Sequence, residues 1–291
     1  MGFYTKNGGK IGALISPTIT PATGSSGVYD LVVSQTNYVP YVAAPVGYAD
    51  FSTAGSYTYV IPLGVESISI ALLGGGGGGG SSGSGTSPEA GGNTTVTYAG
   101  MILTAGAGAA GFVNGSAGAL GALGGTATYS GLIAGATVQT ASAARAPTRI
   151  NNWVACGGGG AARLDGATNA GGAEFSWGGE GGTGTTLLSY PGIGSAGGAG
   201  SNVGEAKGGD GGAYGAGGGG GRDGMGGGGG GLVYATFPVT PGQEVLIVVG
   251  AGGLGENYYN NTRRGGHGSN GYVRIIYGDG RFYPSTGIGN I

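Results

Sequence analysis

Residues 67–80 read Ser67-Ile68-Ser69-Ile70-Ala71-Leu72-Leu73 and then the unbroken glycine run Gly74–Gly80. In the first half of this stretch, Ile and Leu alternate with small residues, which is the period of a strand with one apolar face. Upstream, residues 57–61 alternate in the same way, and Pro62-Leu63-Gly64 then favours a turn. We therefore expect a β-hairpin with one apolar face that leads directly into glycine.

The same pattern returns far downstream. Leu232–Phe237 is followed by Thr240-Pro241-Gly242-Gln243, where Pro then Gly suits a type II turn, and by the apolar stretch Glu244–Val249. A last strand is expected over Tyr272–Tyr277, and weaker strand candidates lie at 94–98 and 101–104. Because the strong strands flank the glycine-rich middle, we expect the two ends of the region to pair. The predicted fold is all-β, a small β-sandwich with strands within 51–73 and 232–277 and a glycine-rich insertion over 74–231.

Glycine accounts for 79 of the 291 residues, so something other than side-chain packing must order this chain. Collagen needs Gly at every third position with abundant Pro, and neither holds here. A flexible Gly/Ser linker would rarely carry aromatic residues between its glycine runs. Threefold extended helices of the polyglycine II type fit better, because main chains without Cβ approach closely enough to bond through N–H and C=O groups. We expect the insertion to be a bundle of such helices.

Charge and rare residues exclude several functions. Eleven Lys+Arg against thirteen Asp+Glu give a net charge of -2 with no basic cluster, which disfavours nucleic acid as a partner. One Cys and one His leave no common metal site, and the many Gly-x-Gly-x-x-Gly matches are expected by chance at this glycine content, so we predict no metal and no cofactor. The acidic residues show no spacing that selects a catalytic pair, and we interpret His267 as a loop histidine, so we expect no enzyme. No apolar run approaches the ~20 residues needed to cross a bilayer.

Residues 1–50 differ from the rest, which forms the predicted glycine-rich domain over 51–291. Pro17, Pro21, Pro40 and Pro45 are spaced through this stretch, and each fixes φ and pushes its predecessor toward extended conformations. The pattern predicts an extended N-terminal arm that docks on a partner surface. A disordered tail is the other interpretation.

Longer interruptions between the glycine runs carry aromatic, Arg and Asn side chains. A flat ring can stack on a ligand while neighbouring polar groups fix its orientation, as in sites that bind sugars or exposed protein loops. The same aromatics would alternatively cover the bundle ends or the sandwich edge. The candidate contact residues are Arg149, Asn152, Trp153, Phe175, Trp177, Tyr190, Tyr214, Tyr258 and Tyr259.

Taken together, the strands and glycine runs resemble the glycine-rich domains of bacteriophage tail fibre proteins over roughly residues 51–291. The resemblance implies a β-sandwich carrying polyglycine helices that present variable loops to a receptor on the host surface, a glycan or an outer-membrane protein. It also implies a virion protein made in the host cytoplasm and released by lysis, with the arm bound to other tail proteins. The matching pieces are Tyr57–Val65, Ile68–Leu73, Gly74–Gly80, Tyr234–Gly253, Gly271–Tyr277 and Arg281–Ser285.

Two departures from this family keep other functions open. The interruptions here are longer and richer in Ala than the loops of the adhesins of T-even-like phages, and the resemblance does not extend to residues 1–50. The same domain could therefore serve as a structural assembly or decoration protein of a tail, capsid or filament, or, less favoured, as a depolymerase. We expect a homo-oligomer, and a trimer would suit a fibre, although neither heptads nor β-helical repeats specify one.

Overall fold

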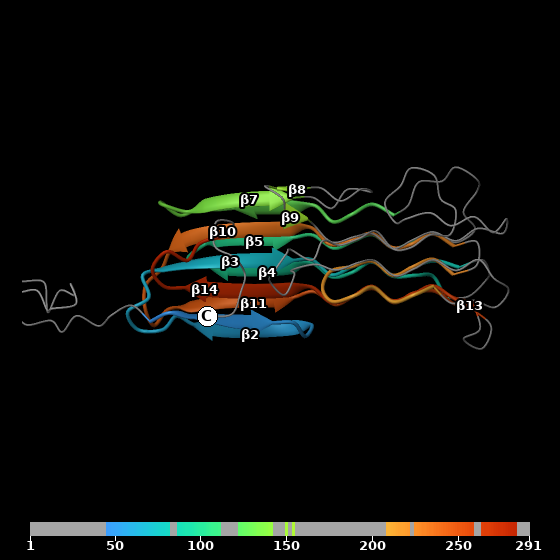
Figure 1. Ribbon diagram of the computed structural model, residues 1–291, viewed down its shortest axis with the longest axis horizontal. Coiled ribbons are helices and arrows are strands. Elements are labelled where there is room, and N and C mark those ends of the chain that lie inside the picture. Colours follow the sequence, from blue (N-terminus) through green and yellow to red (C-terminus); the bar gives the residue numbers. More distant parts are fainter. Residues whose placement is uncertain are drawn as a thin grey trace, which may run out of the picture. The chain divides into compact units, whose positions relative to one another are not determined.

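A computed structural model describes residues 45–81, 86–111, 122–141, 149–150, 153–154, 208–221, 224–258 and 263–283. The chain divides into two compact units, Met1–Ala44 and Pro45–Ile291, and all described residues belong to the second. Their regular structure is entirely β (Figure 1). No helix among them is long and apolar enough to span a membrane. The strands are β1 (Gly47–Phe51), β2 (Gly55–Val60), β3 (Ser67–Leu73), β4 (Thr94–Tyr98), β5 (Met101–Ala105), β6 (Ala127–Ser130), β7 (Thr137–Ala141), β8 (Arg149–Ile150), β9 (Trp153–Val154), β10 (Leu232–Pro238), β11 (Glu244–Val249), β12 (Asn257–Tyr258), β13 (Arg263–Arg264) and β14 (Tyr272–Tyr277).

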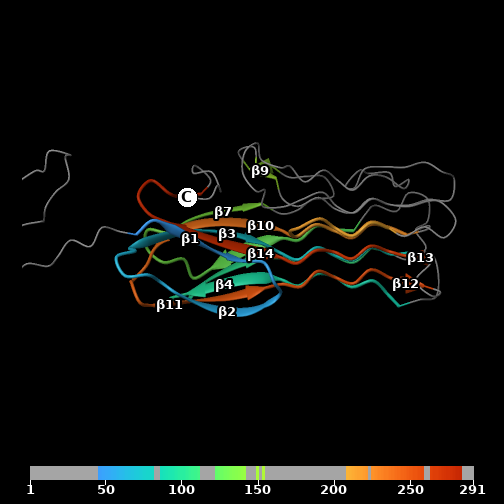
Figure 2. The same ribbon diagram turned by 60° about the horizontal axis from the view of Figure 1, so that its bottom comes forward.

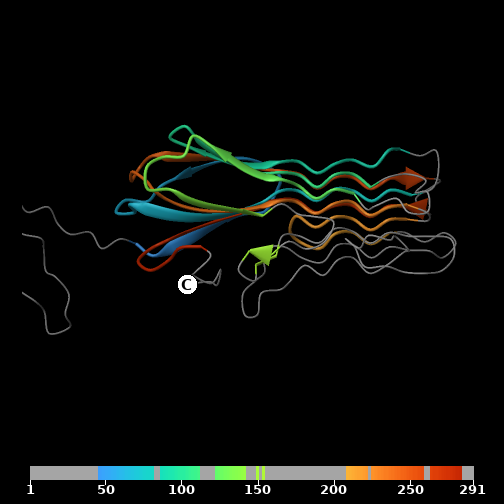
Figure 3. The same ribbon diagram turned by 90° about the horizontal axis from the view of Figure 1, so that it is seen from above.

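Two five-stranded antiparallel sheets form the body of the unit. The first has the order β1-β14-β3-β10-β7 and the second β2-β11-β4-β5-β6. They lie face to face, and the glycine-rich segments leave from the same end of both (Figure 3). Between the sheets lies one apolar core, because alternate residues of each strand point inward. Its fully buried large side chains include Ile68, Ile70, Leu72, Leu103, Phe237, Ile247 and Ile275.

The pairing of distant segments is confirmed. β3 lies between β10 and β14, with Ile70 opposite both Ala235 and Ile275, and β11 pairs with β2. The predicted hairpin over 57–72 is wrong, since β2 and β3 belong to different sheets. The turn at Pro62-Leu63-Gly64 carries the chain across the sandwich, because Ile61 on one side of it and Ile68 on the other both point into the shared core. β10 and β11 are joined across the core in the same way.

The edge strand β1 belongs to the sandwich, so the compact unit begins six residues before the predicted boundary at residue 51. All five residues of β1 pair with β14, and Gly47 lies opposite Tyr277. Asp50 lies opposite Arg274 and accepts two hydrogen bonds from its guanidinium, at 2.6 and 2.8 Å. Tyr272 donates a third at 2.6 Å. The remainder of the predicted arm, residues 1–44, lies outside the described residues.

The two sheets differ in how their outer faces are covered. β3 is buried on both faces over Ile68–Leu73, and Tyr283 covers part of this side by packing on Tyr234 and bonding through its N–H to Ser69. By contrast, β11 alternates strictly between exposed and buried residues. The outer face of the second sheet is therefore open.

Candidate functional site

Among the described residues, most glycine-rich segments continue a strand (Figure 2). Residues 264–271, 74–81 and 224–231 continue β14, β3 and β10 of the first sheet. In the second sheet 250–256, 86–93, 106–111 and 122–126 continue β11, β4, β5 and β6. Residues 208–221 run toward the sandwich, turn at 213–215 and run back beside them without extending a described strand. We call these segments together the glycine array.

The central segment of the array, residues 74–81, donates its backbone N–H groups in a threefold rotation. Successive residues point to three different neighbouring segments, and every third residue returns to the same one, three residues further back along that neighbour. All three neighbours that accept are antiparallel to the centre. At 2.8–3.0 Å the donations are Gly74 to Gly231, Gly75 to Gly92, Gly76 to Ser269, Gly77 to Gly228, Gly78 to Glu89, Gly79 to Gly266 and Gly80 to Met225.

The carbonyl groups of the same segment accept from three other neighbours, which run parallel to it. Here too the partner repeats every three residues. The six neighbours also bond to one another and close into a ring, in the order 86–93, 106–111, 224–231, 215–221, 264–271 and 250–256. In these bonds, 2.8–2.9 Å long, the N–H group of each neighbour donates to a carbonyl of the central segment: Gly108 to Gly75, Gly253 to Gly76, Gly218 to Gly77, Gly111 to Gly78, Glu256 to Gly79 and Gly221 to Gly80.

This arrangement requires the absence of side chains. A Cβ on Gly76 would overlap the carbonyl of Ala216, one on Gly77 that of Ala109, and one on Gly78 that of Leu254. In the sandwich, side chains hold two packed sheets ~10 Å apart. Where the side chains end, at the step from Leu73 to Gly74, the layers close up and main chains bond between layers as well as within them.

At the end of the array away from the sandwich, a side-chain carboxylate replaces the backbone carbonyl as the acceptor for the central segment. Ser81 N–H donates to Glu256 Oε2 at 2.6 Å. Glu256 is fully buried, and its Oε1 and the Ser81 hydroxyl have no hydrogen-bond partner among the described residues. Burial raises the pKa of the Glu256 carboxyl, and the bond from Ser81 acts in the opposite direction. The carboxylate thus caps the central segment.

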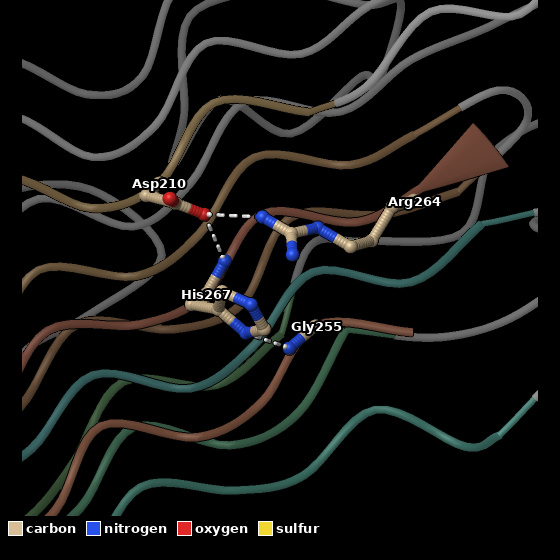
Figure 4. Close-up of polar contacts among 4 residues, drawn as sticks. All are labelled: Asp210, Gly255, Arg264 and His267. Atoms are coloured by element: carbon tan, nitrogen blue, oxygen red, sulfur yellow. Dashed lines mark hydrogen bonds and ion pairs between the residues drawn. The ribbon is translucent and has the colours of Figure 1, made fainter. Parts of the chain in front are cut away.

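His267 joins the array through both its main chain and its ring (Figure 4). The backbone N–H of His267 donates to Asp210 Oδ1 at 2.7 Å, and the ring Nδ1 accepts from Gly255 N–H at 3.0 Å. Arg264 lies 3.5 Å from the same Asp210 oxygen. Asp210 thus bonds to the main chain of His267 and not to its imidazole. His267 lies outside the strands, in a segment without helix or strand, and it links two segments of the array.

Of the predicted contact residues, Tyr214 is the one whose side chain the structure describes. It lies at the turn of 208–221 nearest the sandwich and is partly buried. Its ring stacks on Tyr272, with centroids 4.4 Å apart and planes 13° apart. Tyr272 in turn donates to Asp50, and burial followed by this bond raises the pKa of the Tyr272 phenol. Tyr214 therefore anchors the outer segment to the first sheet.

The remaining candidates are described through their backbone or not at all. Arg149 and Trp153 lie in the short ladder β8–β9, where Arg149 pairs with Val154, and Tyr258 lies in β12 opposite Arg263. The structure brings Tyr258 to the array end away from the sandwich. Outside the described residues lie Asn152, Phe175, Trp177, Tyr190 and Tyr259.

Within the described part of the chain, no three His, Cys, Asp or Glu side chains gather as a metal site would need. A scan against protein-family models finds no match. Searches of curated proteins and of solved structures find none either. Any function must therefore be argued from the array itself.

Proposed function

We propose that the glycine array is a bundle of polyglycine II helices and that the protein is a non-enzymatic bacteriophage tail fibre or receptor-binding protein. The single observation that carries the first half is the threefold rotation of partners around residues 74–81. A helix with three residues per turn points every third N–H in the same direction, whereas a strand alternates between two. Six neighbours around one centre are what such helices need to satisfy all their backbone groups.

Rigidity supports a role as a display platform. Each backbone hydrogen bond contributes only about 0.5–1.5 kcal/mol, but the central segment alone makes more than a dozen. They fix the segment ends relative to one another without using any side chain. Residues facing outward are then available for recognition, since changing them leaves this bonding intact.

The direction of the chain supports the same role. Residue 45 enters the unit beside Gly47, at the end of β1 that pairs with Tyr277, whereas the opposite end of β14 leads into the array. Segment ends at Ser81, Gly221 and Tyr258 lie at the far end of the array. We propose that residues 1–44 attach the unit to other tail proteins and that the far end faces the host receptor.

The test is adsorption to host cells. We expect Tyr258→Ala, at the far end of the array, to reduce binding of purified protein or of virions. Trp153→Ala and Trp177→Ala test the other predicted aromatic contacts in the same assay. Tyr129→Ala is the matched control, because this tyrosine is 48% exposed but lies on β6 of the sandwich. Unchanged adsorption in all three variants would contradict host recognition through these residues.

The alternative is a structural assembly or decoration protein that uses the array as a rigid spacer. Images of the assembled particle separate the two functions. A few copies at the end of a fibre support receptor binding, and a regular array of copies along a shaft or shell supports the alternative.

A further inference from the structure

We infer that the outer face of the second sheet binds the same face of a second copy of this chain. The open face is defined by two rows of side chains that cross all five strands. In each row, every residue lies directly opposite the next one on the adjacent strand. One row is Thr58, Leu246, Thr97, Ile102 and Ser130, and the other is Ser56, Val248, Thr95, Thr104 and Thr128.

The open face carries three exposed apolar side chains. Leu246 is 51% exposed, Ile102 42% and Val248 41%. A shallow depression between β2 and β11, lined by Ser56, Thr58, Leu246 and Val248, gives room for a side chain from outside. Among the described residues, Tyr283 covers part of the outer face of the first sheet, whereas the outer face of the second sheet keeps exposed apolar side chains.

The chemistry of the open face favours an identical partner. None of the ten residues is charged, and the charged side chain that the described strands add to this face, Glu244, lies at the end of β11 beyond Leu246. A partner of defined charge would therefore find little to pair with, and the two rows of two copies would meet without like-charge repulsion. Seven of the ten are Ser or Thr, whose hydroxyls both donate and accept, so the face can satisfy its own copy. Sheets with such β-branched rows pack face to face in sandwiches.

The available area is sufficient when the array is included. Five strands ~4.8 Å apart and about five residues long give a face of roughly 400 Å². The four array segments that continue this sheet present an exposed side with Ala251 and Leu254, and they add a similar area at ~3.1 Å per residue. Together these approach the ~800 Å² per partner of a standard interface. A contact between identical faces is isologous and closes at two copies.

The test is the mass of the full chain in solution, by sedimentation velocity or light scattering over a concentration series. We expect a dimer, and we expect Leu246→Lys and, separately, Ile102→Lys to raise its dissociation constant at least ~100-fold, because each change appears twice in the contact. Leu63→Lys is the matched control, since Leu63 is 77% exposed but lies in the turn after β2, and it should leave the mass unchanged.

Circular dichroism checks that each variant is folded, and two independent positions guard against the failure of one. A monomeric or trimeric wild-type protein would overturn the inference, as would a dimer that a folded Leu246→Lys or Ile102→Lys variant retains. This inference does not depend on host recognition, because adsorption and mass are measured separately.

Discussion

Replacing Gly77 by Ala places a methyl group inside the most crowded part of the array. The new Cβ would overlap the carbonyl of Ala109 and come within 2.9 Å of that of Gly108. Both atoms belong to the backbone and cannot rotate away, so residues 106–111 must move off the central segment.

The cost follows from the hydrogen bonds that this movement breaks. Gly108 N–H to Gly75 and Gly111 N–H to Gly78, both 2.8 Å long, join the two segments directly. Leaving such buried groups unpaired costs about 1–3 kcal/mol per bond. Gly→Ala also lowers the entropy of the unfolded chain, which returns about 0.4–1 kcal/mol. We expect a net loss of about 1–5.5 kcal/mol, the upper part of which is a large share of the stability of an ordinary domain.

Thermal or denaturant unfolding measures the loss, and hydrogen exchange locates it. Amides of the array, such as those of Gly108, Gly111 and Gly228, should exchange faster in Gly77→Ala, while those of β3 and β10 change less. The matched control is Ala251→Ser, which adds one atom at an exposed array position and should stay within about 0.5 kcal/mol of wild type. A Gly77→Ala variant as stable as wild type would refute the argument that close approach of main chains holds the array together.

Three further changes test other parts of the structure. Glu256→Gln removes the buried charge. Burial raises the native pKa of Glu256 above its unfolded value of 4.5. Wild type should therefore lose stability relative to this variant as the pH rises from 4.5 through the raised pKa, which melting curves at several pH values would measure. A difference in melting temperature that stays the same at every pH would contradict this reasoning. Asp50→Asn removes the charge of the carboxylate that accepts two hydrogen bonds from Arg274, whose side chain is 4% exposed, and should cost about 2–3 kcal/mol in denaturant unfolding. Asp279→Asn, in the exposed turn after β14, should change the stability negligibly. Phe237→Ala empties a fully buried position that contacts the Tyr98 ring and should cost about 3–5 kcal/mol, and a variant that melts with wild type would place Phe237 outside the core.

The sandwich could be predicted from the sequence because the residues of each strand alternate between apolar and small or polar side chains. Alternation in 67–72 and 244–249 predicted both the strands and their inward faces, and the position of the glycine-rich middle predicted that distant strands pair. The sheet to which a strand belongs was not accessible. A turn such as 62–64 can close a hairpin or cross between sheets, and both place apolar residues in the core.

The candidate site was less accessible. Glu256, Asp210 and His267 lie among glycines with no periodic neighbours, so no local pattern marks them as partners of array main chains. Tyr214 was expected at a contact surface, but a stack on Tyr272 depends on two segments 58 residues apart that only the fold brings together. One signal was present: Glu256 and Ser81 each stand at the end of a glycine run, where an orphan N–H needs an acceptor.

The return of each hydrogen-bonding partner after three residues gives the array a unit of growth. A glycine segment lengthened by three residues, together with its neighbours, meets the same partners in the same directions, and its tip moves by ~9 Å. Lengthening by one or two residues would turn every later group toward the wrong neighbour. Such a scaffold can change its reach in evolution only in whole steps, with the sandwich and the residues at the tip left as they are.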